Sequence, residues 1–255
     1  MTDKTTEPTI VPAKDFWDRL TDYDQEIMSI FATEQNVVID ALAAVPDKAS
    51  KTVADFGCGV GNSFVHLKDF RTVYAVDYSE NMLELARKQR QPNVELMQGD
   101  IVETRLPEPC DLTLALASVM PENLVHFHAI IQNLVTNTAE NGSIFMALPS
   151  LESRTFGYQL EVEIQAQKGR DPVQIMNSLM EQITLYQFNP LGYMLTDGGM
   201  MQKAWLREEI EFRLSEYGFR AVNIHKFEVE WERQVKRPDM KHLPRHWLWF
   251  VEIQT

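Results

Sequence analysis

Short apolar runs alternate with amphipathic segments along the first 150 residues of the chain. Helical spacing of apolar side chains over residues 14–45 predicts one long helix, which Pro46 ends. Five apolar or β-type runs follow, at residues 52–56, 72–77, 94–97, 111–117 and 143–148. Helical patterns separate these runs, at residues 64–70, after Ser79, and at 122–139. Strands that alternate with helices form βαβ units, so the pattern predicts a parallel sheet with helices on both faces.

The alternation breaks at Pro149, and residues 150–203 are interpreted as an insertion. Within it, Asp171-Pro172 favours a helix start, Asp197-Gly198 a hairpin turn, and Tyr158–Ala166 either a strand or a helix. A helix at 206–217 and strands at 222–229 and 247–253 then complete the pattern.

Four parts of the chain are predicted from this pattern. They are a flexible tail at 1–13, a core with its N-terminal helix at 14–149, a substrate cap at 150–203, and a completion of the core sheet at 204–255.

Composition narrows the partners of the protein. The net charge of −13 disfavours nucleic acid and acidic membranes, because both attract basic surfaces. No apolar run approaches the roughly 18 residues of a membrane span, and the first residues are too polar for a signal peptide. Cys58 and Cys110 are the only cysteines, which suits a reducing compartment. We therefore expect a cytoplasmic protein, either a monomer or a homodimer.

A glycine-rich turn follows the first predicted strand. Gly57, Gly59 and Gly61 allow the backbone to turn sharply and to approach a ligand, at the start of the next helix. A tight strand–helix connection would use the same residues. The dinucleotide fingerprint requires a third glycine at Asn62, which counts against a nicotinamide-dependent enzyme.

Two acidic residues end the next two strands. Asp77 lies twenty positions after Gly57, where a carboxylate can accept hydrogen bonds from both hydroxyls of a ribose. Asp100 follows the third strand, where a carboxylate can bind the amino group of adenine while Ile101 packs on the ring. A helix cap and a plain turn are the alternative interpretations. All three loops converge at the carboxyl edge of the sheet, where α/β proteins bind ligands.

Together these segments resemble the class I family of S-adenosylmethionine (SAM)-dependent methyltransferases. The residues that carry the resemblance are Asp55–Gly61, Val76-Asp77, Gln98–Ile101, Cys110–Ala115 and, more weakly, Leu214–Phe219. The resemblance implies a Rossmann-like three-layer α/β sandwich, with a seven-stranded, mostly parallel sheet whose last strand is antiparallel. It also implies that SAM is the cofactor.

The resemblance assigns roles to individual residues. Asp55 would support the amino group of SAM, Gly57 and Gly59 would pass along its methionine part, and Ala117 and Ser118 would face the sulfonium. The full predicted cofactor set is Asp55, Gly57, Cys58, Gly59, Asp77, Tyr78, Met82, Asp100, Ile101, Ala117 and Ser118.

The segment after the fourth strand departs from one branch of that family. Methyltransferases that act on adenine or glutamine amides carry an Asn/Asp-Pro-Pro-aromatic motif there, whereas this chain has Ala117-Ser-Val-Met-Pro121. The departure argues against such acceptors and favours a small molecule.

Candidate residues for catalysis and acceptor binding are less sharply marked. Methyl transfer from a sulfonium depends mainly on alignment and requires a general base only for some acceptors. His126, His128 and Tyr158 are candidate catalytic residues. The candidate acceptor-binding residues are Phe16, Trp17, Tyr23, Tyr158 and Tyr193. The histidine spacings do not favour a metal site.

The predicted activity is therefore SAM-dependent methylation of an oxygen, nitrogen or thiol sulfur on a small molecule. Two alternatives remain: an enzyme specific for small thiols, and a SAM-fold partner subunit without catalytic activity.

Overall fold

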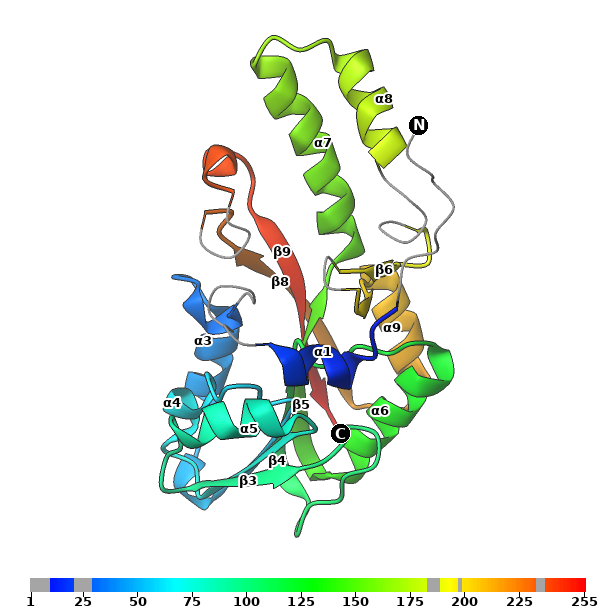
Figure 1. The fold of residues 1–255 in the computed structure, drawn as a ribbon. Coiled ribbons are helices and arrows are strands. Elements are labelled where there is room, and N and C mark those ends of the chain that lie inside the picture. Colours follow the sequence, from blue (N-terminus) through cyan, green and yellow to red (C-terminus); the bar gives the residue numbers. More distant parts are fainter. Residues whose placement is uncertain (1–9, 21–28, 183–188, 197–198, 233–236) are drawn as a thin grey trace.

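A seven-stranded sheet forms the centre of the computed structural model, which describes residues 10–20, 29–182, 189–196, 199–232 and 237–255. Its strand order is β3-β2-β1-β4-β5-β9-β8 (Figure 1). The strands are β1 (Thr52–Phe56), β2 (Thr72–Asp77), β3 (Val94–Gln98), β4 (Cys110–Leu116), β5 (Thr138–Pro149), β8 (Ala221–Val229) and β9 (His246–Gln254). Strand β9 is antiparallel to both of its neighbours, whereas β1 to β5 pair in parallel. The predicted fold class is confirmed.

Helices cover both faces of this sheet and make three layers. On one face lie α3 (Val37–Ala44), α4 (Phe64–Leu67) and α5 (Glu80–Arg87), and on the other lie α6 (Leu124–Thr136) and α9 (Arg207–Ser215). Alternate residues of β1 serve the two faces, since Val53 packs with the first group and Ala54 with the second. Asn36, Ser79 and Asn123 cap α3, α5 and α6, each accepting a hydrogen bond from a backbone N–H of the first turn.

The prediction of one helix over residues 14–45 is wrong. The described residues form α1 (Ala13–Arg19), the short 3-10 helix η1 (Ile30–Ala32) and α3. The backbone is extended at Leu20, Ser29 and Thr33, and the side chain of Asn36 then starts a new helix. Each piece packs separately against the core, so the apolar spacing persists although the helix does not.

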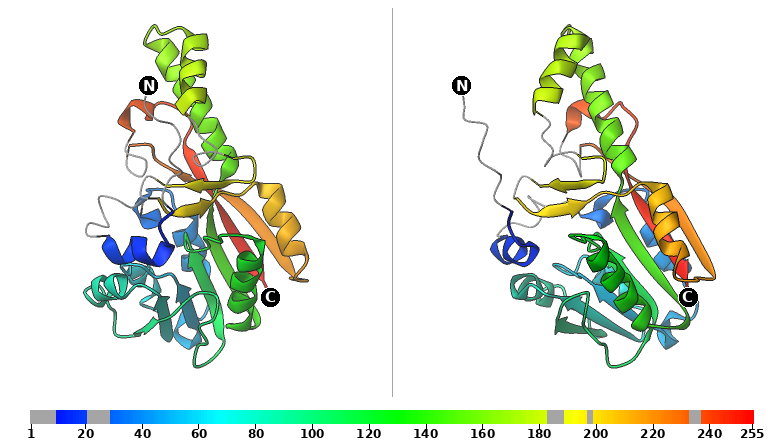
Figure 2. Two further views of the ribbon diagram at one scale, coloured as in Figure 1. Left: turned by 45° about the vertical axis from the view of Figure 1, so that its right-hand side comes forward. Right: turned by 90° about the vertical axis from the view of Figure 1, so that its right-hand side faces the viewer.

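The insertion divides into two structures. Helices α7 (Leu151–Gln167) and α8 (Pro172–Gln182) form a hairpin that extends away from the sheet, which we call the arm (Figures 1 and 2). Residues 158–166, left open between strand and helix, are helical. Strands β6 (Tyr193–Leu195) and β7 (Met201–Lys203) form a separate antiparallel pair. The turn predicted at 197–198 lies outside the described residues.

Two contacts fix these structures to the rest of the molecule. Leu160 and Ile164 of the arm pack on Trp231 and Met240, close to the short 3-10 helix η3 (Pro238–Met240). The β6–β7 hairpin meets the N-terminal segment, because the backbone N–H of Val11 donates to the carbonyl of Gly199 at 2.9 Å. Helix η2 (Lys48–Ser50) directly precedes β1 in the chain.

Candidate cofactor and acceptor site

The glycine loop after β1 is held against β2 and β4. The N–H groups of Gly57 and Cys58 both donate to the carbonyl of Val76, at 2.7 and 3.1 Å. Gly57 has a φ of +73°, and a Cβ there would lie 2.3 Å from the Cβ of Ser118. Only glycine therefore fits this position, in both backbone conformation and space.

Asp77 connects this loop to the next helix. One carboxylate oxygen accepts from the N–H of Gly59 and the other from the N–H of Ser79, each at 2.9 Å. The same carboxylate lines the cavity described below, where it can also accept a hydrogen bond from a ligand. The side chain is 6% exposed, and burial raises the pKa of Asp77 while the backbone N–H groups oppose the rise.

Asp55 is the most deeply buried acid of the site, with 2% exposure. The hydroxyl of Ser63 donates to its carboxylate at 2.5 Å. Burial raises the pKa of Asp55 to about 6, the hydrogen bond from Ser63 opposes the rise, and the charge of Asp77 adds to it. An acid with this pKa changes charge close to neutral pH.

Asp100 lies in the turn after β3. One carboxylate oxygen accepts from the N–H of Val102 at 2.9 Å, and the carbonyl of Ile101 accepts from the side-chain amide of Asn133 at 2.7 Å. These bonds fix the turn, so that Asp100 and Ile101 both face the cavity described next.

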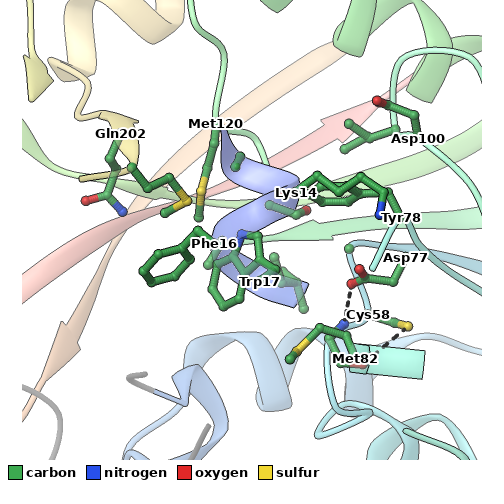
Figure 3. Close-up of a pocket in the computed structure, with 18 of the residues that line it drawn as sticks. Lys14, Phe16, Trp17, Cys58, Asp77, Tyr78, Met82, Asp100, Met120 and Gln202 are labelled. Carbon is green, nitrogen blue, oxygen red and sulfur yellow. Dashed lines mark hydrogen bonds between the residues drawn. The ribbon is translucent and has the colours of Figure 1, made fainter. Parts of the chain in front are cut away.

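A cavity of about 890 Å³ lies at the carboxyl ends of the strands, between the three acids, α1 and the β6–β7 hairpin (Figure 3). Ligand sites of drug size span roughly 300–1,000 Å³, so this cavity is large enough for a nucleoside ligand and a second small molecule.

Helix α1 covers this cavity. The hydroxyl of Ser79 donates to Asp18 at 2.6 Å, and the amide of Asn81 donates to the carbonyl of Leu20 at 2.8 Å. Phe16 and Trp17 meet edge to face at 5.2 Å between ring centroids, and both line the cavity.

Most of the residues predicted from the sequence come together in this cavity. Those that line it are Phe16, Trp17, Asp55, Gly57, Cys58, Gly59, Asp77, Tyr78, Met82, Asp100, Ile101, Ala117, Ser118 and His126. Burial raises the pKa of Cys58 well above its usual value, so the thiol stays protonated and acts as a packing group at neutral pH.

The structure places three other candidates elsewhere. His128 faces Tyr217, with 2.6 Å between its Nδ1 and the phenol oxygen. Tyr158 lies on α7 of the arm, and Tyr193 packs over the ammonium of Lys203 at 5.3 Å. None of the three lines the cavity among the described residues. Tyr23 lies outside the described residues.

The cavity wall also contains residues that the sequence patterns did not single out. They are Pro12, Ala13, Lys14, Ser29, Ile30, Phe31, Asn62, Ser63, Leu116, Met120, Glu122, Ile130, Thr196, Met200 and Gln202. Met120 and Glu122 follow β4 directly, so their distance from the predicted strand end could have indicated them. Thr196 and Gln202 reach the site through the pairing of Val11 with Met200, for which the sequence offers no local signal.

Two further properties concern the described part of the chain. It contains no cluster of three His, Cys, Asp or Glu side chains suited to a metal ion. None of its helices combines the length and the apolar character that crossing a membrane requires.

Comparisons with known proteins define the class. Residues 53–142 match the family model described as a methyltransferase domain. DhpI in complex with S-adenosylhomocysteine (SAH) superposes with a TM-score of 0.57 at 13% identity, covering 93% of this chain and 92% of that chain. Magnesium protoporphyrin IX methyltransferase from Synechocystis with bound SAM gives a TM-score of 0.53 at 14% identity, covering 85% and 76%. The fold is that of the class I, Rossmann-like SAM-dependent methyltransferases.

Residues 53–142 are thus similar to a methyltransferase domain, and solved structures that share the fold bind SAM or SAH. The prediction of SAM instead of a nicotinamide dinucleotide is confirmed. Trans-aconitate 2-methyltransferase of Methylobacterium nodulans is 31% identical over 134 residues, which cover 51% of each chain. The enzyme of that name from Azoarcus is 36% identical over 115 residues, 40% of this chain and 45% of the relative. The matches thus span about half of these relatives.

The residues present fit SAM. The acids Asp55, Asp77 and Asp100, near the carboxyl ends of β1, β2 and β3, all line the cavity and can accept hydrogen bonds from the polar groups of SAM. The close approach of Gly57 to Ser118 leaves the glycine loop without a side chain on this wall.

Proposed function

We propose that this protein transfers the methyl group of SAM to a small molecule that occupies the part of the cavity not filled by SAM. The single observation that carries the proposal is the continuity of the cavity. It runs from the acids Asp55, Asp77 and Asp100 to the wall formed by Phe16, Met120 and Gln202.

Each acid has a distinct role in this proposal. Asp55 pairs with the ammonium of SAM, Asp77 accepts hydrogen bonds from the ribose hydroxyls, and Asp100 accepts from the adenine amino group beside Ile101. Ala117 supports this arrangement, because its φ of +60° turns the chain sharply after β4 and places Ser118 against Gly57. The hydroxyl of Ser118 donates to the carbonyl of Phe56 at 2.7 Å, which fixes that turn.

SAM supplies an activated methyl group. When bound, it would donate this methyl group to a lone pair of the acceptor, with the carbon–sulfur electron pair remaining on sulfur in the product SAH. The chain contributes by holding both molecules in line and by excluding water beneath α1. An acceptor that carries a proton releases it to solvent or to a group of the cavity wall. The acceptor atom is oxygen, nitrogen or thiol sulfur.

Among the residues of the cavity wall, His126 is the candidate general base for an acceptor that carries a proton. Its Nδ1 accepts from the backbone N–H of Glu122 at 3.3 Å, so in the neutral ring Nε2 carries the proton. In this tautomer His126 donates a hydrogen bond and does not act as a base.

Incubation of the protein with SAM and fractionated metabolites tests the function. Formation of SAH that depends on one fraction, together with a product heavier by one methylene, supports the proposal. The Asp77→Asn variant serves as the control. A protein that binds SAH but forms no methylated product from any fraction would instead be a partner subunit.

A further inference from the structure

The charges on the cavity wall are unbalanced. The described residues that line it include the acids Asp55, Asp77, Asp100 and Glu122, and Lys14 is the one lysine or arginine among them.

Lys14 already has a partner. Its ammonium donates to Asp18 at 2.6 Å, and Asp18 also accepts from the hydroxyl of Ser79. In Figure 3, Lys14 is drawn beside Tyr78 and Asp100, on the opposite side from Met120 and Gln202. The positive charge of Lys14 is therefore paired with Asp18, on the side of the cavity assigned to adenosine.

The opposite side of the cavity, which we call the acceptor wall, is apolar with a few neutral polar groups. Its residues are Phe16, Met120, His126, Ile130, Thr196, Met200 and Gln202. The hydroxyl oxygen of Thr196 accepts from the N–H of Met200 at 3.2 Å, and Nδ1 of His126 accepts from Glu122. The amide of Gln202 is left as a neutral donor and acceptor that faces the cavity.

Resting on the proposed function, we propose that the acceptor is an uncharged, largely apolar small molecule, and that acceptors with several carboxylates are excluded. A carboxylate buried against this wall would lose its hydration without gaining a cation, which disfavours its binding. The positive charge of the SAM sulfonium could compensate for the lost hydration of only one carboxylate, the one that receives the methyl group. The net charge of −13 adds a repulsive field for anions.

This inference separates the protein from the trans-aconitate 2-methyltransferases that it partly matches, because trans-aconitate is a tricarboxylate. The matched domain, residues 53–142, does not include Phe16, Thr196, Met200 or Gln202 of the acceptor wall. It includes the other three acceptor-wall residues, Met120, His126 and Ile130, so the matched domain accounts for only part of that wall.

Calorimetry on the full chain tests the inference. The protein is first titrated with SAH, and the saturated protein is then titrated with 2-naphthol, with 2-naphthoate, which has the same rings and a carboxylate, and with trans-aconitate. We expect 2-naphthol to bind roughly tenfold more tightly than 2-naphthoate, and trans-aconitate to give no saturable binding. Gln202→Arg should reduce the difference in affinity between 2-naphthol and 2-naphthoate. Gln167→Arg, on the exposed end of α7, should leave this difference unchanged.

The outcomes are distinct. Failure of SAH to bind contradicts the proposed function itself. If SAH binds, then equal or tighter binding of 2-naphthoate or trans-aconitate overturns the inference about the acceptor, as does the absence of binding by 2-naphthol.

Discussion

Asp77 shows how one side chain can serve both the fold and a ligand. Its two oxygens brace the glycine loop through Gly59 and the start of α5 through Ser79. The sequence indicated the position of Asp77, but the bracing role needs the loop geometry, which glycine spacing alone does not specify.

Asp77→Asn should weaken SAH binding by roughly tenfold to a hundredfold, since one oxygen is lost from a buried contact worth about 1–3 kcal/mol. Calorimetry measures the change. Asp111→Asn is the matched control, because Asp111 also braces a backbone N–H, that of Thr52 at 2.9 Å, but does not line the cavity. Equal losses of affinity in the two variants would mean that Asp77 acts only through stability.

The pKa of Asp55, about 6, predicts a pH dependence of binding. Below pH 6 the acid of the ligand-free protein is protonated and must release its proton to pair with an ammonium. The Kd for SAH should therefore rise as the pH falls through 6, by up to about tenfold per pH unit. Titrations between pH 5 and 8 check this, and Asp55→Asn should give weaker binding with a flatter profile.

The raised pKa of Asp55 affects the stability of the ligand-free protein in the opposite direction, because a higher pH favours ligand binding but lowers this stability. The pKa lies above its ordinary value of 3.8, so the contribution of Asp55 to stability is fully present below about pH 3.8 and is lost as the pH rises from there through about 6. Asp55→Asn should therefore raise the Tm of the ligand-free protein at pH 8. A lowered Tm there would show that the charge is better compensated than its burial implies.

At the scale of elements, the central strands were the most predictable part. Strands β1 and β2 occupy the expected residues and β4 is shifted by one, because short runs of buried apolar residues separated by helical patterns mark the strands of a covered parallel sheet. The break between α1 and α3 was not predictable, since helical spacing of apolar residues survives a change of direction. The site on the sheet followed from the strand ends, whereas the acceptor wall depends on a hairpin distant in sequence.

Lys203 fixes this hairpin. Its side chain is 1% exposed, and its ammonium donates to Glu209 and to the carbonyls of Leu191 and Ala204 at 2.7, 2.7 and 3.0 Å. Lys203→Met should lower the free energy of unfolding by about 2–4 kcal/mol, since it leaves buried acceptors unpaired.

Urea denaturation measures this loss, and SAH affinity should change by less than about twofold because the hairpin contacts the acceptor side. Lys226→Met, at an exposed lysine over the ring of Trp247, is the control. A stability equal to that of the unaltered protein would show that the hairpin is held by other contacts.

At the scale of the whole molecule, the insertion has two separate positions. The β6–β7 hairpin contributes Thr196, Met200 and Gln202 to the cavity, whereas the arm extends away from it (Figure 2). A pattern of apolar residues in the insertion could not distinguish these two positions, because both bury apolar side chains.

Limited trypsin digestion should show that the arm lies away from the cavity, whereas α1 covers it. Cleavage after Lys14 and Arg19 of α1 should slow when SAH is bound, because α1 covers the cavity. Cleavage after Lys168 and Arg170, between α7 and α8, should keep the same rate. Mass spectrometry of the fragments follows both. Protection of Lys168 and Arg170 by SAH would instead indicate that the arm, like α1, covers the cavity.

The pairing of Val11 with Gly199 and Met200 joins two segments that lie far apart in the sequence. Such a junction closes a very long loop with few hydrogen bonds, so it should be among the first to open by local fluctuation, well before the sheet. In hydrogen exchange, the amide of Val11 should then exchange orders of magnitude faster than those of β1. We therefore expect ligands to enter and leave by a small, reversible opening of this junction, so that the rate of opening limits how often the site can exchange its contents.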